Sequence, residues 1–168
     1  MQLEVFDNFL PPEEFKRIQE TLTSPNFPWF FINGKSSPNE ANKNMFQFVH
    51  MFYMDYSWRS EYSSLLDPFI HILQPVSLIK VKANLTTISE KPIQSEYHRD
   101  VFLTSPKSKT ACFYLNTNNG YTKFNNNQIV ESVANRLAVF DAENLHAGVN
   151  QTDETTRIVI NFNFFSRL

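Results

Sequence analysis

The sequence is short of cysteine and glycine, and each shortage excludes a class of protein. Its single cysteine, Cys112, rules out an intramolecular disulfide and suits a reducing cytoplasm. Only three glycines are present, so a glycine-rich phosphate-binding loop is excluded. No stretch approaches the roughly 20 apolar residues that span a bilayer, and the opening MQLEVFDNFL lacks the features of a signal peptide. We therefore expect a soluble, cytoplasmic protein with no membrane partner.

The chain also carries little net charge. The 15 basic residues are set against 17 acidic ones, and a net charge of −2 lacks the basic footprint of a non-specific nucleic-acid binder. Aromatic residues are plentiful instead, with 17 phenylalanines among 168 residues. Such a chain can build an aromatic-rich core, and its length fits one domain that covers residues 1–168.

The first 76 residues predict a helical support region. Four segments are expected there: a helix at 11–23, a loop at 33–44, a strand at 45–56 and a second helix at 60–73. Pro11 and Pro12 suit the first turn of the earlier helix. Pro68 interrupts the later helical pattern, which predicts either a kink or two short helices.

Residues 77–168 change to the two-residue period of strands. Eight short strands are expected, at 78–88, 97–103, 110–116, 121–124, 129–133, 136–140, 145–149 and 156–165. Together with the N-terminal portion, they predict a mainly β fold with N-terminal helices. The architecture we expect is a closed sandwich or jelly roll with the helices packed on one sheet.

The last expected strand, TRIVINFNFF, has two different faces. One face is wholly apolar and carries Ile158, Ile160, Phe162 and Phe164. The other is largely polar and carries Arg157, Val159, Asn161 and Asn163. We expect the apolar face to be buried under the helices. Pattern alone favours a solvated polar face, as in a half-buried antiparallel sheet, and the alternative is that this face lines a cavity.

The tripeptide His98-Arg99-Asp100 contains two potential metal ligands. Residues i and i+2 of a strand share a face, so His98 and Asp100 would point the same way. His146 offers a third ligand, 46 residues after Asp100 and at the start of an expected strand. Arg157 follows 11 residues later, on the polar face of the last strand.

Two imidazoles and one carboxylate form the facial triad associated with non-haem Fe(II), which leaves coordination positions open for a co-substrate and O2. An arginine beyond the third ligand supplies the two-pronged partner of a carboxylate. Each part is weak alone, and the specific signal is their order along the strand pattern.

For the other histidines we expect structural positions: a core or boundary position for His71 in FIHIL, and a buried one for His50 in FVHMFY, although His50 could line a cavity.

Longer segments extend the pattern. They are FDNFLPPEEFKRI, ACFYLNTNNGYTKF, NRLAVFDAENLHAGVN and TRIVINFNF. With the triad, they resemble the Fe(II)/2-oxoglutarate-dependent dioxygenases, most closely the prolyl 4-hydroxylase-like branch and its short phage forms. Two departures stand out. Asn119-Gly120-Tyr121 replaces the usual Gly-Gly after Leu-Asn, and the strand-one tyrosine of several relatives has no clear counterpart.

The resemblance implies a double-stranded β-helix at residues 77–168. It also implies a hydroxylase that uses Fe(II), 2-oxoglutarate and O2, with ascorbate as a candidate reductant. His98, Asp100 and His146 would hold the iron, and 2-oxoglutarate would chelate it through the keto acid end.

The resemblance further implies partners for the distal carboxylate of 2-oxoglutarate. That group would pair with Arg157 and accept a hydrogen bond from Tyr114. Asn84 or Thr86 would stand in for the missing strand-one tyrosine.

The substrate remains a choice between classes. Peptidyl proline is the leading expectation, a small molecule or free amino acid comes next, and nucleic acid is disfavoured by the weak basic character. We expect the loops at 33–44, 89–97 and 103–109 to decide between them. Two alternatives compete with the enzyme: a jelly roll whose site is vestigial or structural, and a cupin-like metal-binding protein with other chemistry.

Overall fold

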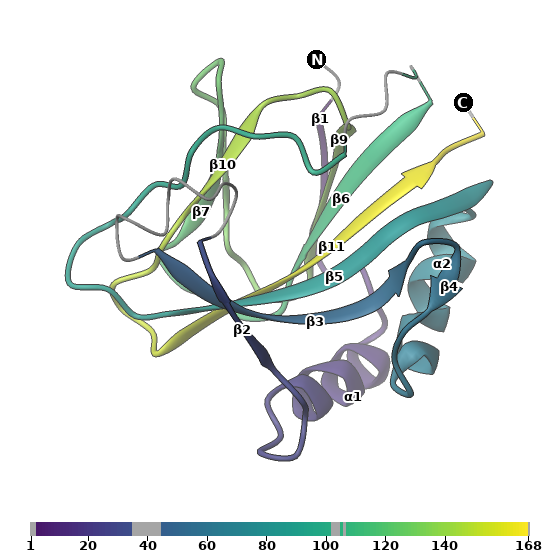
Figure 1. The fold of residues 1–168 in the computed structure, drawn as a ribbon, viewed down its shortest axis with the longest axis horizontal. Helices are drawn as coiled ribbons and strands as arrows, with labels where there is room; N and C mark the ends of the chain where they lie inside the picture. Colours follow the sequence, from purple (N-terminus) through teal and green to yellow (C-terminus); the bar gives the residue numbers. More distant parts are fainter. Residues whose placement is uncertain (1–2, 35–44, 102–104, 106, 168) are drawn as a thin grey trace.

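A large antiparallel sheet forms the centre of the molecule (Figure 1). The structure, a computed structural model, describes residues 3–34, 45–101, 105 and 107–167. Within these residues the strand order is β1-β9-β6-β11-β5-β3-β2, and β4 pairs with β3. The strands are β1 (Leu3–Phe6), β2 (Phe30–Asn33), β3 (Phe46–Met54), β4 (Ser57–Trp58), β5 (Ser77–Thr87), β6 (Ser108–Tyr114), β9 (Arg136–Asp141) and β11 (Thr156–Phe165).

A smaller sheet lies on one side of the larger one. Its order is β10-β7-β8, with β10 at His146–Val149, β7 at Tyr121–Phe124 and β8 at Ile129–Glu131. Figure 1 shows β7 and β10 across from β5 and β11, on the side away from the helices. The prediction of a mainly β, antiparallel fold is confirmed, and the arrangement fits a β-sandwich of the jelly-roll kind.

The helices cover the other side of the large sheet. Helix α1 spans Pro12–Leu22, and its first turn carries Glu13 and Glu14 at the positive end of the helix dipole. The second predicted helix is divided in two: a 3-10 helix at Ser63–Leu66 and α2 at Asp67–Leu73, with Pro68 in the first turn of α2. A proline is tolerated there because no backbone N–H is needed. No helix in the described part of the chain is long and apolar enough to cross a membrane.

The main core lies between these helices and the sheet. The apolar face of β11 is buried as expected and packs in one cluster with Ile18 and Leu22 of α1. Phe162 of β11 lies against Phe69 of α2, with ring centroids 4.7 Å apart. Burial of the apolar face orients β11, because every second residue must then face the smaller sheet.

The polar face of β11 is turned inward, not toward solvent. Arg157 is 8% exposed, Val159 5% and Asn163 fully buried. The solvated face that pattern alone favours is therefore wrong, because the smaller sheet covers Arg157 and the segment that carries Asp100 covers Asn163. The alternation of the strand was read correctly, but what lies over each face is a tertiary property.

The strand predicted at 97–103 is not formed as a continuous element. Two isolated bridges to β10 replace it, Gln94 with Val149 and His98 with His146. Between them the chain makes other bonds, such as that from the Gly148 amide to the Ser95 hydroxyl at 3.0 Å. Residues 102–104, and residues 35–44 of the loop expected at 33–44, lie outside the described residues.

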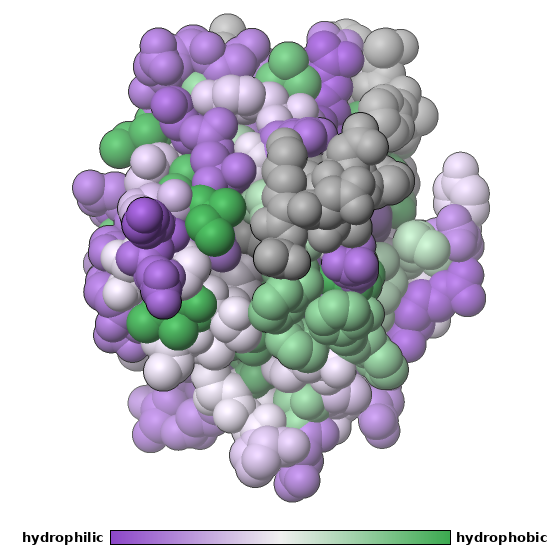
Figure 2. Space-filling model, turned by 60° about the vertical axis from the view of Figure 1, so that its left-hand side comes forward, coloured by the Kyte–Doolittle hydropathy of each residue, from purple (hydrophilic) through white to green (hydrophobic). Residues whose placement is uncertain are grey.

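β2 forms an edge of the large sheet and was not predicted. All four of its residues are exposed, so it lacks the alternation that marks a half-buried strand. The exposed apolar residues of β2 and the first residue of β3 are Phe30, Phe31, Ile32 and Phe46. Figure 2 shows apolar side chains gathered on one face of the molecule.

Candidate metal centre

Three potential metal ligands converge between the two sheets. His98 and Asp100 come from the segment that bridges to β10, and His146 is the first residue of β10. Two backbone hydrogen bonds join these histidines. The His98 N–H donates to the His146 carbonyl at 2.9 Å, and the His146 N–H donates to the His98 carbonyl at 3.1 Å. His98 Nε2 lies 3.8 Å from Asp100 Oδ1, and His146 Nε2 lies 3.7 Å from Asp100 Oδ2. One donor atom from each residue lies within 4.8 Å of the other two.

Backbone carbonyls orient both imidazoles. Nδ1 of His98 lies 2.9 Å from the Glu96 oxygen, and Nδ1 of His146 lies 3.1 Å from the Asn144 oxygen. A carbonyl can only accept, so Nδ1 carries the proton in both rings. Each Nε2 is then left with its lone pair toward Asp100, which is the arrangement that metal-binding histidines use.

The electrostatic surroundings of His146 and Asp100 favour the protonation states in which they bind a metal. Burial is the main cause that lowers the pKa of His146, which keeps this ring neutral. Burial alone would raise the pKa of Asp100, but the nearby His146, Lys80, His98 and Lys82 together lower it. A neutral imidazole and an ionised carboxylate are the states in which these residues bind a metal.

Two asparagines of β11 hold the carboxylate. Nδ2 of Asn161 lies 3.2 Å from Asp100 Oδ2, and Nδ2 of Asn163 lies 3.5 Å from the same oxygen. Asn163 also donates to the Thr110 hydroxyl at 3.0 Å. The Asp100 side chain is 7% exposed, so these amides replace the water that would otherwise orient it. Donor types, orientation and outer partners together fit the two-histidine, one-carboxylate set of non-haem Fe(II).

The cluster opens into a cavity of about 290 Å³ between the sheets. The cavity is lined by Gln47, Lys80, Lys82, Asn84, Thr86, Ser95, His98, Arg99, Asp100, Cys112, Thr122, His146, Gly148, Arg157, Val159 and Asn161. Four of these side chains are cationic and one is a carboxylate. A cavity near the lower end of the roughly 300–1,000 Å³ range of ligand pockets suits small ligands.

Arg157 lies in this cavity without an acidic partner among the described residues. Its Nε donates to the Ser132 hydroxyl at 2.7 Å, and Nη2 lies 3.4 Å from the Thr122 hydroxyl. Its guanidinium carbon lies 5.6 Å from the centre of the Tyr114 ring. Burial lowers the pKa of Arg157, since no carboxylate compensates for the lost water. A buried guanidinium without a carboxylate partner would be stabilised by an anion in the cavity.

Gly120 leaves room for the Arg157 stem. A Cβ built on Gly120 would lie 2.8 Å from Arg157 Cδ, 2.8 Å from Asn118 Oδ1 and 2.9 Å from the Val149 carbonyl. All three distances are shorter than real Cβ contacts, so only glycine fits here. The remaining glycine of the expected Gly-Gly pair therefore has a packing role beside Arg157.

The structure places Tyr114 next to the cavity, not on its wall. Its side chain is fully buried, and its hydroxyl donates to the Thr122 hydroxyl at 2.8 Å. A hydroxyl accepts two hydrogen bonds and donates one. Since Tyr114 and Arg157 use both acceptor positions of Thr122, the Thr122 proton is left to donate to a bound group.

Asn84 and Thr86 both line the cavity, on the face of β5 next to Arg157 and Val159. The Thr86 hydroxyl donates to the Gln151 side chain at 3.3 Å. The Asn84 amide has no hydrogen-bond partner within the part of the chain that the structure describes. Of the two, Asn84 is the one with an amide to offer to a ligand.

Sequence reasoning missed several cavity or cavity-supporting residues, among them Lys80, Lys82, Thr122 and Ser132. The two lysines carry a signal that was available, because they alternate with Val81 along the same strand face as Asn84. Thr122 and Ser132 lie on other strands and turns, and no local pattern points to them.

The other two histidines lie outside the cluster. His50 is buried as expected, with Nδ1 bonded to the Pro28 carbonyl and its ring 4.4 Å from that of Phe27. His71 is exposed on α2, so the core or boundary position expected for it is wrong. Phe69 is the buried residue of α2, and Leu73 packs against the same core.

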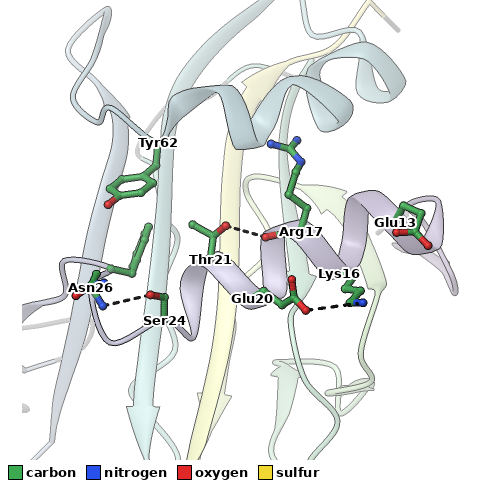
Figure 3. Close-up of a pocket in the computed structure, with 9 residues that line it drawn as sticks. Glu13, Lys16, Arg17, Glu20, Thr21, Ser24, Asn26 and Tyr62 are labelled. Carbon is green, nitrogen blue, oxygen red and sulfur yellow. Dashed lines mark hydrogen bonds and ion pairs between the residues drawn. The ribbon is translucent and has the colours of Figure 1, made fainter.

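A second, more open cavity of about 470 Å³ lies on the helix side (Figure 3). Its walls come from the outer face of α1, the turn after it, and Tyr62. The charged side chains there pair locally, as Lys16 does with Glu20 at 3.9 Å. It contains neither histidine nor an uncompensated buried charge, so the cavity between the sheets is the better candidate for the functional site.

No protein-family model and no curated protein sequence matches the chain. Solved structures do match. A viral collagen prolyl hydroxylase from Paramecium bursaria Chlorella virus-1, in a 2-oxoglutarate complex, is similar with a TM-score of 0.60 and 14% identity, over 100% of this chain and 97% of that one. A Pseudomonas putida prolyl-4-hydroxylase is similar with a TM-score of 0.62 and 14% identity, over 98% and 92% of the two chains.

A third similar structure is SnoN, a non-heme alpha ketoglutarate dependent epimerase from nogalamycin biosynthesis. Its TM-score is 0.68 at 17% identity, over 98% of this chain and 76% of that one. Identities this low establish a shared fold. The chain thus has the fold of prolyl hydroxylases and other 2-oxoglutarate-Fe(II) oxygenases, as the sequence resemblance predicted.

Proposed function

We propose that this chain is an Fe(II)- and 2-oxoglutarate-dependent dioxygenase built on a double-stranded β-helix, and that it hydroxylates a C–H bond of an amino-acid substrate. One observation carries the proposal: a two-histidine, one-carboxylate cluster shares a small cavity with a buried arginine that lacks an acidic partner. A metal site alone would fit many proteins, and the arginine adds the requirement for a dicarboxylate.

His98, Asp100 and His146 hold the metal in this proposal. Their outer partners fix one proton on each Nδ1 and keep the carboxylate ionised. Fe(II), 2-oxoglutarate and O2 together supply the oxidising chemistry, with succinate and CO2 as co-products. The hard chemistry belongs to the cofactor, and the protein binds, orients and excludes water.

Arg157 binds the distal carboxylate of 2-oxoglutarate through its guanidinium. Ser132 fixes Nε, which leaves the outer edge of the fork for the ligand. Thr122 donates its proton to the same carboxylate, and Tyr114 acts through Thr122. Asn84 of β5, which pairs with Val159 of β11, adds an amide donor.

The linkage between the metal and 2-oxoglutarate tests the proposed function. We expect 2-oxoglutarate to bind far more tightly to the Fe(II)-loaded protein than to the metal-free protein, because the keto acid end needs the metal. Anaerobic titration calorimetry measures both affinities. Equal affinities, or no binding at all, would favour a structural site or a cupin-type metal protein with other chemistry.

Replacing Gly120 by alanine is expected to weaken 2-oxoglutarate binding about tenfold while Fe(II) binding is kept. The added methyl group displaces the Arg157 stem, and overpacking of this kind costs roughly 1–3 kcal/mol. Calorimetry with each ligand measures the two affinities. Gly34→Ala is the control, since Gly34 has a φ of 87° that disfavours alanine but lies away from the cavity lining. It should lower stability without changing 2-oxoglutarate affinity, and an unchanged affinity in Gly120→Ala would contradict the packing role.

A further inference from the structure

Two lysines lie beside the three metal ligands, His98, Asp100 and His146, and have no role in the proposed mechanism. Lys80 and Lys82 project from β5 into the cavity between the sheets. Their cross-strand neighbours on β11 are Asn163 and Asn161, the two asparagines that hold Asp100. Directly paired residues have Cβ atoms about 5 Å apart, so both lysines stand at the metal end of the cavity.

The lysines lie at the level of the metal ligands along the sheet, away from Arg157. Arg157 is four residues from Asn161 on β11, which is roughly 13 Å along a strand. A co-substrate that reaches from the metal to Arg157 therefore extends away from Lys82. The space next to Lys82 is left for the substrate.

The two ammonium groups are differently engaged. Lys80 Nζ donates to the Asp100 carbonyl at 2.8 Å. Lys82 makes neither a hydrogen bond nor an ion pair with any described residue, although Asp100 and Lys80 both act on it through space. Next to it, the buried Oδ1 of Asn161 also lacks a hydrogen-bond partner. The cavity wall therefore presents an ammonium group that no described residue uses.

A charge balance at this site rests on the proposed function. Fe(II) is neutralised by Asp100 and the keto acid carboxylate of 2-oxoglutarate, and Arg157 by the distal carboxylate. Of the four cations that line the cavity, Arg99 is exposed at the mouth and bonds the Glu143 carbonyl. The positive charge of Lys80 and Lys82 is left over, inside a protein whose net charge is −2.

We propose that Lys82, with Lys80 beside it, binds the carboxylate of a free amino-acid substrate. A free amino acid carries the α-carboxylate that a peptide residue lacks, which suits a cavity with an unneutralised cation. Its small size also suits a cavity of about 290 Å³ that is shared with 2-oxoglutarate.

A prolyl residue within a peptide matches this end of the cavity poorly. Its flanking amides are neutral, so it offers no anion to the Lys82 ammonium. Binding it would bury the Lys82 ammonium without an anion, which is unfavourable. The lysine pair therefore favours the free amino acid over the peptide as substrate class.

The test is a binding experiment without turnover. Protein loaded with Fe(II) and 2-oxoglutarate under anaerobic conditions is titrated with free L-amino acids, each compared with its own carboxamide, and with a proline peptide blocked at both ends. Binding is measured from the change in the visible absorption of the metal complex. We expect at least one free amino acid to bind about tenfold to a hundredfold more tightly than its carboxamide, the range of a charge-assisted hydrogen bond.

Variants then assign the effect to the lysine. Lys82→Met should remove most of the preference for the acid over the amide, while the affinity for 2-oxoglutarate stays within about twofold. Lys82→Arg retains the positive charge and should keep part of the preference. It provides the test if Lys82→Met folds poorly. Lys16→Met, which removes an exposed charge on α1, should behave as wild type.

Four results would overturn the inference. The blocked peptide could bind while no free amino acid does, or the acid and amide could bind equally. Lys82→Met could instead weaken 2-oxoglutarate as much as the amino acid, which would place Lys82 in the co-substrate site. If the metal complex with 2-oxoglutarate does not form at all, the proposed function fails and this inference fails with it.

Discussion

Replacing His146 by alanine is expected to abolish Fe(II) binding at micromolar metal. The variant keeps two of three ligands, and loss of even an outer-shell partner costs about 10- to 100-fold in metal affinity. We therefore expect a loss of more than about a hundredfold. Competition against a metallochromic chelator measures the Fe(II) affinity in the absence of oxygen.

Two further variants separate the loss of a ligand from a change in packing. The His146 ring packs 5.0 Å from that of Phe140, so alanine also leaves a hole. Asp100→Asn keeps the shape of the side chain but removes the charge, and it should also weaken Fe(II) binding strongly. His71→Ala removes an exposed imidazole and should bind as wild type. Wild-type affinity in His146→Ala would remove this residue from the metal site.

Replacing Arg157 is expected to raise the requirement for 2-oxoglutarate while Fe(II) binding is retained. Arg157→Ala removes a charge-assisted pair that contributes roughly 1.5–3 kcal/mol, which corresponds to about a tenfold to hundredfold loss of affinity. Arg157→Lys keeps the charge but loses the fork, so its loss should be smaller. Calorimetric titration of the Fe(II)-loaded variants with 2-oxoglutarate measures the effect.

The Arg157 variants separate mechanism from metal binding. Arg157 lies four residues along β11 from the nearest asparagine that holds Asp100, so the metal ligands should keep their positions. An equal affinity for 2-oxoglutarate in wild type and Arg157→Ala would exclude Arg157 from the mechanism even if the iron site proved real.

Periodicity made much of the fold predictable. The alternation in β11 fixed which residues meet the helices and which face the smaller sheet. Pro68 correctly indicated a break between two short helices. The exposed edge strand β2 was not predictable, because its stability comes from pairing with β3 and not from its own pattern.

The candidate site was predictable where its chemistry is unusual. A histidine, an aspartate two residues later and a second histidine at a strand start are informative because ligand chemistry needs those residue types. Lys80 and Lys82 were missed because a polar strand face is usually solvated, and only the smaller sheet turns this face into a cavity wall. The role of Thr122 depends on contacts with Tyr114 and Arg157, which are distant in sequence and arise from the tertiary fold.

The central claim is that the three metal ligands and Arg157 together bind Fe(II) and 2-oxoglutarate, and a single spectrum can test it. Protein mixed with Fe(II) and then with 2-oxoglutarate, without oxygen, should develop a weak visible charge-transfer band that neither ligand gives alone. The account predicts that this band is absent in His146→Ala and appears in Arg157→Ala only at higher 2-oxoglutarate concentration. A wild-type protein that binds Fe(II) but shows no band at saturating 2-oxoglutarate would contradict it.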